Sequence, residues 1–564
     1  MNSRPVARLL GACLVAGVVW VPSSVQAGDD SFDIRRFEIV GNTLLPEAVL
    51  ESSVAPYAGN GKGYGDVQKA LEALEGRYRQ AGYSTVQVYV PEQELAQGVV
   101  RLQVTEGVIG AITVTGNQHF STQNIRATLP ALQEGKAPNA RVLSENIQLA
   151  NENPAKQVEV TLGVSEQEGK VDAKVKVADE DPQRVFATLD NTGTGATGKY
   201  RLGIAYQNAN LFDRDHALTL AYQTAPSKPE GVKVDVFSIG YRIPLYSVGD
   251  SIDFIFGKSS VNTPTSTPVL GGALGITGKG DVLGVRYNHI FARQGEYASR
   301  LVAGLDRKYM DTRCSINGAP VAITPPTPPI ASCVPYTVRP LSLTYSGQWQ
   351  RPAQVLDFTI GIAHNLPLGS RYLNVDGRTD RYSYLTPGNR ATPDDFTILR
   401  LGASWTQVWD ERWQTRLAAS GQYAATPLVA AEQFGLAGSS AVRGFNERAV
   451  AMDTGYVVNA ELYGPDLASA IGLPGNLRPL AFYDFARGYN HDTVRPLAIS
   501  TPMQKVGIAA IGAGLRYNLR KDISLRLDLA QVVDAGPVDV PGAGTLNTES
   551  RGDWRGHMAL TVGF

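Results

Sequence analysis

Few side chains in this sequence of 564 residues stand at spacings that could support catalysis. No histidines lie at a metal-ligand spacing, and the sequence contains no HExxH, GxSxG or Walker A motif. Gly193–Gly198 matches the dinucleotide-binding pattern GxGxxG, but a strand-like run follows it where a phosphate-binding turn would open a helix. We therefore expect no enzyme activity, no catalytic or metal-binding residue, no cofactor and no nucleotide. The six histidines are His119, His216, His289, His364, His491 and His557.

One arginine stands in a setting suited to another kind of chemistry, the recognition of a carboxylate. Arg443 lies in the motif VRGF, within a long segment at about residues 424–451 between two strand-like runs. A guanidinium can bind a carboxylate through two parallel N–H donors, and a glycine permits a tight turn with positive φ. Further along, Phe482 and Asp484 share the parity of one strand, so both side chains point to the same face. An exposed arginine in a glycine turn is the alternative.

The elements that position these residues are strands. From about Arg184 to the end of the chain, segments of about ten residues alternate between apolar and polar side chains. The polar faces carry Arg, Asp, Gln and Gly, as a watery lumen requires, and Tyr and Trp recur near the ends of the apolar faces. A soluble sandwich also alternates, but short turns that alternate with long polar loops favour a transmembrane barrel, whose closure leaves no unpaired backbone in lipid. The segments begin near Val185, Tyr200, Ala217, Val232, Ile252, Val282, Ser299, Val338, Leu356, Thr397, Gln414, Thr454, Leu477, Val506, Ile523 and Arg555.

Two copies of a smaller domain precede the strands. Residues 37–42 read FEIVGN and residues 112–117 read ITVTGN, and each stretch is followed by two helical segments and two alternating segments. The open edge of such a sheet can bind an extended peptide through main-chain hydrogen bonds. A generic α+β domain is the alternative. The helical face of the first copy consists of Val67, Leu71, Leu74 and Tyr78.

The N-terminus and the cysteines indicate export. Arg4 and Arg8 precede the apolar run Leu9–Val21 and a cleavage site after Ala27, which predicts a secretory signal peptide. Besides Cys13, the chain has two cysteines that bracket a proline-rich segment, and in an oxidising compartment we expect them to form a disulfide. Two unpaired loop thiols are the alternative. The expected disulfide joins Cys314 and Cys333.

The order of the domains resembles that of the BamA superfamily, in which POTRA domains precede a barrel of sixteen strands. Within it the chain resembles the two-partner secretion transporters (TpsB family; ShlB, FhaC and HecB types). That family carries Val/Ile-Arg-Gly-Phe/Tyr at the tip of its sixth extracellular loop and Phe-x-Asp-x-Gly on the inner wall of the thirteenth strand. Here Phe482 and Asp484 match the second motif, with Ala486 in place of the glycine. The loop-tip motif is Val442, Arg443, Gly444 and Phe445.

The resemblance implies a membrane all-β fold, a 16-stranded antiparallel transmembrane β-barrel preceded by two α+β POTRA domains. It also implies that the loop folds into the lumen, where Arg443 meets Asp484 and Phe445 packs against the wall. Only Gly28–Ser31 precede the first strand, so we expect no N-terminal plug helix of the kind common in the family. The expected boundaries are a signal peptide at 1–27, POTRA domains at 28–107 and 108–182, and the barrel at 183–564.

The implied function is secretion. The POTRA domains, in the periplasm, would capture an unfolded TpsA-like exoprotein of haemolysin or adhesin type, with a binding region that includes the helical face of the first copy. The barrel, in the outer membrane among lipid and lipopolysaccharide, would conduct the exoprotein outward. A net charge of −1 gives no footprint for nucleic acid. Alternatives are a BamA- or TamA-like assembly factor, which normally has three or more POTRA domains, and a porin or uptake channel, which has none.

Overall fold

A computed structural model describes residues 31–564 except 95, 196, 230–231, 261–263, 267–274, 278, 312–314, 317–318, 321–334, 374–378, 383–391, 411, 492–504, 537–538, 541–543 and 546–548. The expected signal peptide and both cysteines of the expected disulfide, Cys314 and Cys333, lie outside the described residues. The chain forms two compact units. The first extends to Ala81 and includes Val86–Glu106, and the second consists of Gly82–Thr85 and Gly107–Phe564.

The first unit is an α+β domain whose sheet has the order β2-β5-β4, with β2 parallel to β5 and β4 antiparallel to it. The core lies between this sheet and the helices, where Leu50, Leu74 and Leu102 are fully buried. Its elements are β1 (Phe32–Ile34), β2 (Arg36–Val40), α1 (Glu47–Val54), η1 (Ala55–Tyr57), β3 (Gly59–Lys62), α2 (Tyr64–Gln80), β4 (Val86–Tyr89), η2 (Ala96–Gly98) and β5 (Val99–Glu106).

The second unit begins with a domain of the same plan. Its sheet has the order β6-β8-β7, again with a parallel pair and an antiparallel pair. Ile125, Leu129 and Val175 lie in its core. Its elements are β6 (Val108–Thr115), α3 (Thr122–Ala127), α4 (Ala140–Ala150), β7 (Lys156–Val164) and β8 (Lys170–Asp179).

The repeated Gly-Asn pair has the same structural role in both domains. Gly41 and Gly116 adopt φ values of +89° and +87°. A Cβ atom would lie 2.4 Å from a backbone carbonyl oxygen at Gly41 and 2.2 Å from one at Gly116, so no larger residue fits at either position. The amide of Asn42 donates to the Leu45 carbonyl (2.7 Å), and the Asn117 amide donates to the Phe120 carbonyl (2.9 Å). These contacts explain why the pair recurs at the end of the first strand of each copy.

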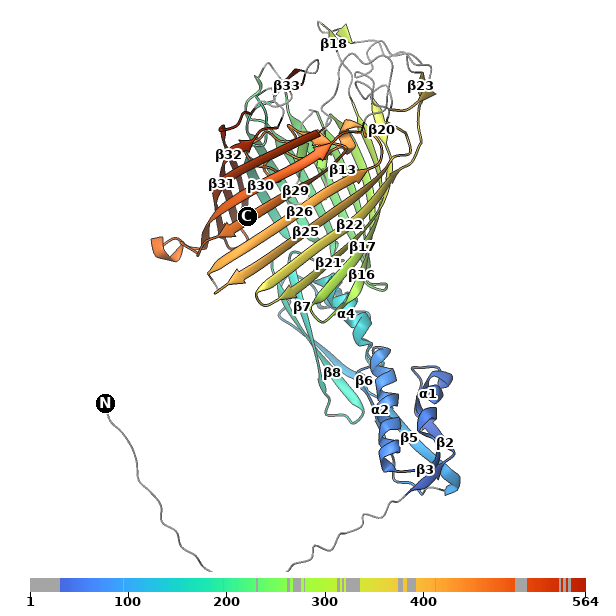
Figure 1. Ribbon diagram of the computed structural model, residues 1–564. Helices are drawn as coiled ribbons and strands as arrows, with labels where there is room; N and C mark the ends of the chain where they lie inside the picture. Colours follow the sequence, from blue (N-terminus) through green and yellow to red (C-terminus); the bar gives the residue numbers. More distant parts are fainter. Residues whose placement is uncertain are drawn as a thin grey trace, which may run out of the picture. The chain divides into compact units, whose positions relative to one another are not determined.

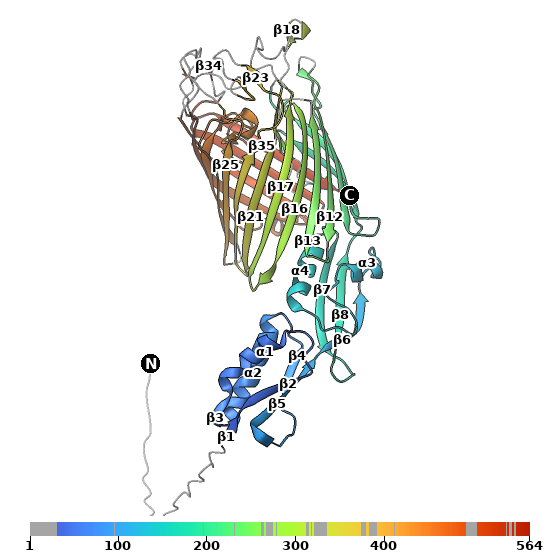
Figure 2. The same ribbon diagram turned by 90° about the vertical axis from the view of Figure 1, so that its right-hand side faces the viewer.

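The remaining strands close into an antiparallel barrel (Figures 1 and 2). The first barrel strand, β9, pairs with its neighbour β10 and also with the last strand, β35, through a register that runs from Ala559–Asp190 to Gly563–Phe186. β20 and β21 lie end to end along β17 and act as one strand, so the barrel has sixteen. The strands are β9 (Gln183–Asp190), β10 (Arg201–Leu211), β11 (His216–Thr224), β12 (Asp235–Leu245), β13 (Asp250–Ser259), β16 (Gly280–Gln294), β17 (Tyr297–Met310), β20 (Tyr336–Val338) with β21 (Pro340–Arg351), β22 (Gln354–Asn365), β25 (Thr397–Trp409), β26 (Trp413–Ala424), β29 (Thr454–Tyr463), β30 (Asn476–Tyr489), β31 (Lys505–Leu519), β32 (Ile523–Asp534) and β35 (Trp554–Gly563).

Short paired strands and single-turn helices occupy the connections at the end of the barrel away from the second α+β domain, apart from η8 at the near end. They are β14 (Pro264–Ser266) with β15 (Gly275–Thr277), β18 (Ser315–Ile316) with β19 (Ala319–Pro320), β23 (Tyr372–Leu373) with β24 (Thr379–Asp380), η7 (Ala430–Glu432), β27 (Phe434–Gly435) with β28 (Ala451–Met452), η8 (Ser469–Ile471), and β33 (Asp539–Val540) with β34 (Gly544–Thr545).

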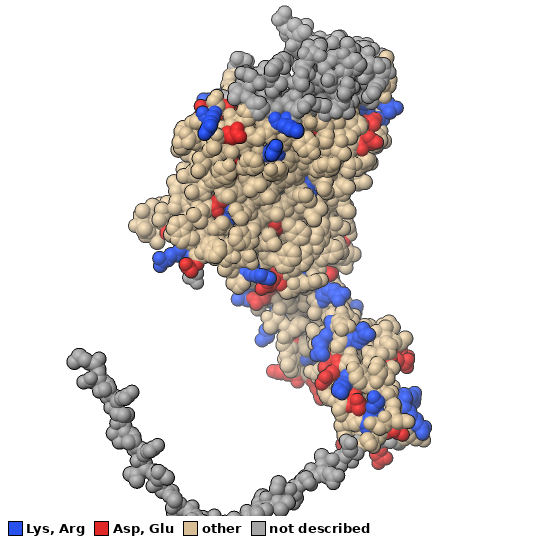
Figure 3. Space-filling view, viewed as in Figure 1, with Lys and Arg blue, Asp and Glu red and all other residues tan. Residues whose placement is uncertain are grey.

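The outer face of the barrel is apolar. On β10, Leu202 and Ile204 are exposed on the outside, whereas Arg201 and Ala205 are buried on the inside. Figure 3 shows that Lys, Arg, Asp and Glu on the visible face of the barrel gather towards its two ends, with few between them. Among the described residues, no helix is long and apolar enough to cross a membrane. The predicted fold class is confirmed, and every predicted strand start lies within three residues of a barrel strand.

The second α+β domain contacts the barrel through buried polar side chains. Lys156, at the start of β7, forms an ion pair with Asp215 in the turn between β10 and β11, and both side chains are buried. Tyr246, in the next turn at the same end of the barrel, donates its hydroxyl to Asp215 (2.5 Å). Glu152 forms ion pairs with Arg242 (2.7 Å) and Arg300 (3.2 Å). Of these pairs only Lys156–Asp215 is buried on both sides, so removing either partner would leave an unpaired buried charge at the contact between domain and barrel.

Candidate functional site

The segment that connects β26 to β29, residues 425–453, lies against the inner wall of the barrel. Within it, β27 pairs with β28, and Ala437 forms a bridge to Val442, so the loop has its own hairpin. Leu436, Val442 and Phe445 are fully buried. They share one apolar cluster with inward-facing side chains of β30, β31 and β32, namely Phe482, Ala486, Ile508, Ala510, Ala530 and Val532.

The structure brings Arg443 and Asp484 together at the tip of this loop. Arg443 donates from Nε to Asp484 Oδ2 (2.6 Å) and from Nη2 to Oδ1 (2.7 Å), and its backbone N–H donates to Oδ2 (3.1 Å). The two side chains are 2% and 0% exposed. The guanidinium carbon lies 3.4 Å from the centre of the Phe482 ring, within the range of a cation–π contact. This is the bidentate geometry in which an arginine binds a carboxylate most strongly.

Two further carboxylates surround the same guanidinium. Glu461 Oε1 lies 2.9 Å and Asp528 Oδ1 lies 3.5 Å from Nη1 of Arg443. Each of these acids also has its own cation, because Arg416 lies 3.1 Å from Glu461 and Arg526 lies 2.7 Å from Asp528. Asp484 differs from them. Apart from Arg443, the hydrogen bonds to its carboxylate come from a neutral group, the Asn459 amide (2.8 Å).

The residues after Arg443 fit the wall closely. Gly444 has a φ of +97°, and its N–H donates to Nε2 of His557 on β35 (3.0 Å). A Cβ atom at Gly444 would lie 3.3 Å from Cγ2 of Val532 on β32. Phe445 is fully buried in the apolar cluster, and Ala486, which replaces the glycine of the family motif, is fully buried in it as well. The methyl group of Ala486 is therefore accommodated by the close packing at this wall.

A second ion-pair cluster holds the base of the loop, and the sequence analysis did not find it. Glu432, in η7, is buried between two cations of the barrel wall. Its carboxylate lies 2.8 Å from Nζ of Lys308 on β17 and 2.9 Å from Nη2 of Arg400 on β25. The inward parity of Arg400 was visible in the sequence, but nothing in the loop distinguished Glu432 from its acidic neighbours.

The predicted cargo-binding face of the first α+β domain is a packing face. Val67, Leu74 and Tyr78 of α2 are buried, and Leu71 is half-buried. The Tyr78 hydroxyl donates to Oδ1 of Asn42 (2.7 Å). Burial, with a smaller contribution from a nearby carboxylate, raises the pKa of Tyr78 to about 12. These side chains hold the helix on the sheet, and the location of a cargo-binding region in this domain stays a prediction.

The chain matches two protein families. Residues 169–517 match the haemolysin secretion/activation protein ShlB/FhaC/HecB, and residues 32–107 match the ShlB-type POTRA domain. Among curated proteins, the outer membrane transporter CdiB of Dickeya dadantii is 23% identical over 474 residues, which cover 82% of this chain and 77% of the relative. The heme/hemopexin transporter protein HuxB of Haemophilus influenzae is 19% identical over 511 residues, which cover 89% of this chain and 84% of the relative.

Solved structures share the fold. CdiB from Escherichia coli superimposes with a TM-score of 0.70 at 18% identity, over 97% of this chain and 93% of that one. CdiB from Acinetobacter baumannii gives a TM-score of 0.66 at 15% identity, over 95% and 90%. At these identities the likeness concerns the fold alone.

Proposed function

The chain belongs to the ShlB/FhaC/HecB family of haemolysin secretion/activation proteins, and from that membership we propose how its loop controls the export of a partner. The chain is an outer-membrane transporter that secretes a partner exoprotein through its barrel, with its POTRA domains in the periplasm. The end of the barrel that carries the second POTRA domain is therefore periplasmic, and the opposite end is extracellular. The family is a secretion channel rather than an enzyme.

The proposed gate is the loop at about 424–451. Two of its contacts with the inner wall are ion pairs. Arg443 pairs with Asp484 on β30, and Glu432 pairs with Lys308 on β17 and Arg400 on β25. An extended cargo chain needs the space that this loop occupies, so transport requires the loop to move. The single observation that carries the proposal is the bidentate contact between Arg443 and Asp484, because a fully desolvated pair of this kind holds one geometry until both partners separate.

The partner is proposed to be a large exoprotein of haemolysin or adhesin type, bound in the periplasm as an extended chain. The main-chain groups at the edge of a POTRA sheet, where β6 or β7 is the outermost strand, suit such a chain because they bind without regard to sequence. The GxGxxG match at Gly193–Gly198 precedes a strand rather than a helix, and the sequence contains no Walker A motif. Folding of the partner outside the cell would then bias net movement, since a folded exterior cannot slide back. Outer-membrane lipid and lipopolysaccharide are proposed as the surroundings of the barrel.

Arg443→Ala tests the gate. Arg443→Ala leaves Asp484 as an unpaired buried charge, so the loop loses the defined docked position from which it moves and to which it returns. We therefore expect secretion of the partner into the medium to fall at least about tenfold, while the barrel stays folded and heat-modifiable on gels. Arg351→Ala is the matched control, because Arg351 also pairs with a carboxylate (Glu296, 2.8 Å), but both of those side chains are exposed at the periplasmic rim. Secretion at the wild-type level by Arg443→Ala would show that the loop mechanism is wrong.

A further inference from the structure

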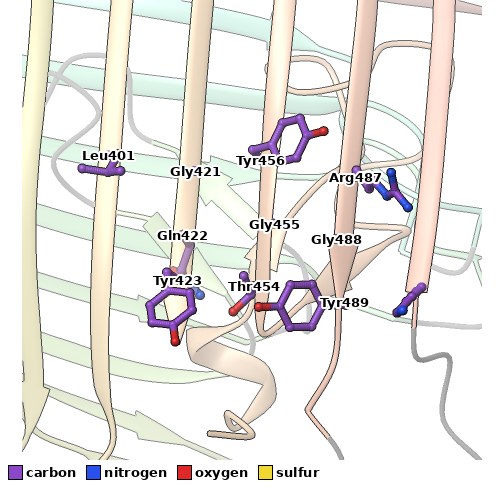
Figure 4. Close-up of a pocket in the computed structure, with 11 residues that line it drawn as sticks. Leu401, Gly421, Gln422, Tyr423, Thr454, Gly455, Tyr456, Arg487, Gly488 and Tyr489 are labelled. Atoms are coloured by element: carbon purple, nitrogen blue, oxygen red, sulfur yellow. The ribbon is translucent and has the colours of Figure 1, made fainter. Parts of the chain in front are cut away.

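A groove of about 710 Å³ lies on the outer wall of the barrel, at the extracellular ends of four strands (Figure 4). It spans β26, β29, β30 and β31, and its edge reaches β25. Its lining is mostly apolar or aromatic, with two cations at one side. The residues are Leu401, Gly421, Gln422, Tyr423, Thr454, Gly455, Tyr456, Arg487, Gly488, Tyr489 and Lys505.

The groove exists because a glycine interrupts a row of large outward side chains. The strand registers place Leu401, Gly421, Tyr456 and Arg487 side by side across four neighbouring strands. Leu401 and Tyr456 are 49% and 45% exposed, whereas Gly421 between them contributes no side chain. A Cβ atom at Gly421 would meet only the backbone and Cβ of its neighbours, at 3.3 Å or more. At this row the floor of the groove is therefore bare backbone, with a large exposed side chain on either side.

The next row towards the extracellular end places Thr454, Tyr489 and Lys505 side by side. Lys505 is thus on the strand next to Arg487 and one row further out, a spacing at which both cations can contact one anion. Neither has a hydrogen bond or ion pair with any residue that the structure describes. By contrast, Arg307 on the outer wall lies 2.8 Å from Asp281. Arg487 and Lys505 therefore form a pair of neighbouring outward cations that have no acidic partner among the described residues. Near the end of the barrel, where lipid head groups lie, such a cluster suits an anionic ligand.

We propose that this groove binds lipopolysaccharide of the outer leaflet. Arg487 and Lys505 bind a phosphate of its glycolipid head, and one acyl chain lies over Gly421 between Leu401 and Tyr456. The extracellular position of the groove matches the outer leaflet, the two neighbouring cations match a phosphate, and the mostly apolar lining matches an acyl chain. The proposal rests on the outer-membrane location of the chain and is independent of the gating role of Arg443.

The position of the groove gives the bound lipid a further effect. Gly455 and Gly488 form part of its floor, and on the inner side of the wall a Cβ atom at either glycine would lie within 3.1 Å of Leu436 in the lumen loop. Lipid and loop are therefore separated by little more than the thickness of the backbone. A lipid in the groove would stabilise the wall against which the closed loop packs.

The test is ligand-induced thermal stabilisation of the purified full-length protein in detergent. Lipopolysaccharide, phosphatidylglycerol and inorganic phosphate are titrated separately against the wild type, the double variant Arg487→Ala/Lys505→Ala, and Gly421→Leu, which fills the groove and keeps both cations. Lys258→Ala is the matched control, because Lys258 is an exposed, outward-facing cation near the extracellular end of β13. Heat-modifiability of each variant shows that its barrel is folded.

We expect lipopolysaccharide to raise the melting temperature of the wild type and of Lys258→Ala. In the other two variants the half-maximal shift should need at least about tenfold more lipopolysaccharide. Unchanged titrations in both groove variants would overturn the proposal. If phosphatidylglycerol shifts the melting temperature as much as lipopolysaccharide does, the groove binds any anionic lipid. If inorganic phosphate does so, the groove is only an anion site. Either result also overturns the proposal. Secretion by Arg443→Ala is a separate measurement, so failure of the gate and failure of the lipid site are distinguishable.

Discussion

At the scale of single residues, Arg443 and Asp484 depend on each other unequally. Without Asp484, the guanidinium still faces Glu461 and Asp528. Without Arg443, the carboxylate of Asp484 keeps the Asn459 amide and one backbone N–H. We expect Arg443→Ala to weaken the docked state of the loop by about 3–5 kcal/mol and Asp484→Ala by less. The measurement is the rate at which an external protease cuts the loop in intact cells.

The double variant Arg443→Ala/Asp484→Ala completes this comparison. Because it leaves no buried charge at the Asp484 position, its loop should be cut more slowly than that of Arg443→Ala alone. Additive effects of the two substitutions would mean that the pair is not energetically coupled.

The two residues after Arg443 should act through packing rather than charge. Gly444→Ala forces a side chain into a positive φ and against Val532, at a cost of about 1–3 kcal/mol. Phe445→Ala empties a fully buried site and should cost about 3–5 kcal/mol. Both variants should increase protease cutting of the loop at every pH, and their control is Phe212→Ala, an exposed aromatic residue in a periplasmic turn. Wild-type resistance in both variants would contradict the tight packing.

The sequence was sufficient to propose Arg443, Asp484 and Phe482, but not the acids beside them. Strand parity tells which face a side chain points to, and it put Phe482 and Asp484 on one face. Whether Glu461 or Asp528 lies at the same height depends on the stagger of neighbouring strands. That stagger follows from the registers in which neighbouring strands pair, and the sequence of one strand alone does not predict them.

At the scale of elements, the loop has a second anchor in η7, and Glu432→Gln tests it. The substitution keeps the shape of the side chain but leaves Lys308 and Arg400 facing a neutral amide. We expect the base of the loop to loosen, so hydrogen exchange at residues 430–436 should speed up while the barrel strands keep their protection. Glu296→Gln, at an exposed ion pair, is the control. Unchanged exchange at 430–436 would show that the Arg443 contact alone holds the loop.

The stability of the second POTRA domain should fall in acid, because Asp179 becomes protonated. Burial alone would raise the pKa of this carboxyl, but backbone N–H donors of Gln118, His119 and Phe120 together hold it below its usual value. The ionised Asp179 therefore stabilises the folded domain at pH values above the pKa of an aspartate in the unfolded chain, about 3.9. This stabilisation is lost as the pH falls through the lower pKa of Asp179 in the folded domain.

Asp179→Asn removes that stabilisation at neutral pH. In the full-length variant, the amides of Gln118, His119 and Phe120 should exchange faster at pH 7, whereas the equivalent turn of the first domain, held by Glu106, should not change. Exchange at the wild-type rate would mean that these hydrogen bonds add nothing to the fold.

The helical periodicity of α2 predicted which of its side chains pack in the core, but it did not predict which residues bind a partner. The spacing of Val67, Leu71, Leu74 and Tyr78 identified one face of α2. An apolar face at that spacing is most often the one that meets a core, and three of the four side chains are buried there. The strand edges open to a peptide follow from sheet order, which the sequence of a helix does not contain.

At the scale of the whole molecule, all sixteen barrel strands were predictable because each has its own alternation and a membrane imposes it on every strand. Only the family resemblance predicted that the 425–453 loop folds into the lumen. A loop that docks through a few side chains has no periodic sequence pattern from which its path could be predicted. The same limit applies to the lipid groove, which depends on residues that become neighbours only through the pairing of four strands.

Loss of the whole chain should have a narrow effect. Deleting its gene should abolish secretion of one exoprotein and leave the bulk composition of the outer membrane intact, because a dedicated transporter serves one partner. The measurement is mass spectrometry of the medium and of the outer-membrane fraction, with complementation by the wild-type chain as the control. A general loss of barrel proteins would favour an assembly factor.

If the partner binds as proposed, the buried contact between Lys156 and Asp215 would also determine where transport starts. Since it attaches the second POTRA domain to the turn between β10 and β11, a polypeptide bound at the sheet edge of that domain would reach the periplasmic rim of the barrel at one place. The distance from the sheet edge of that domain to the barrel opening would then be fixed, and a set number of extended residues, at about 3.3 Å each, would span it. The exoprotein would then enter the barrel from one fixed side and would not have to diffuse across the periplasmic opening.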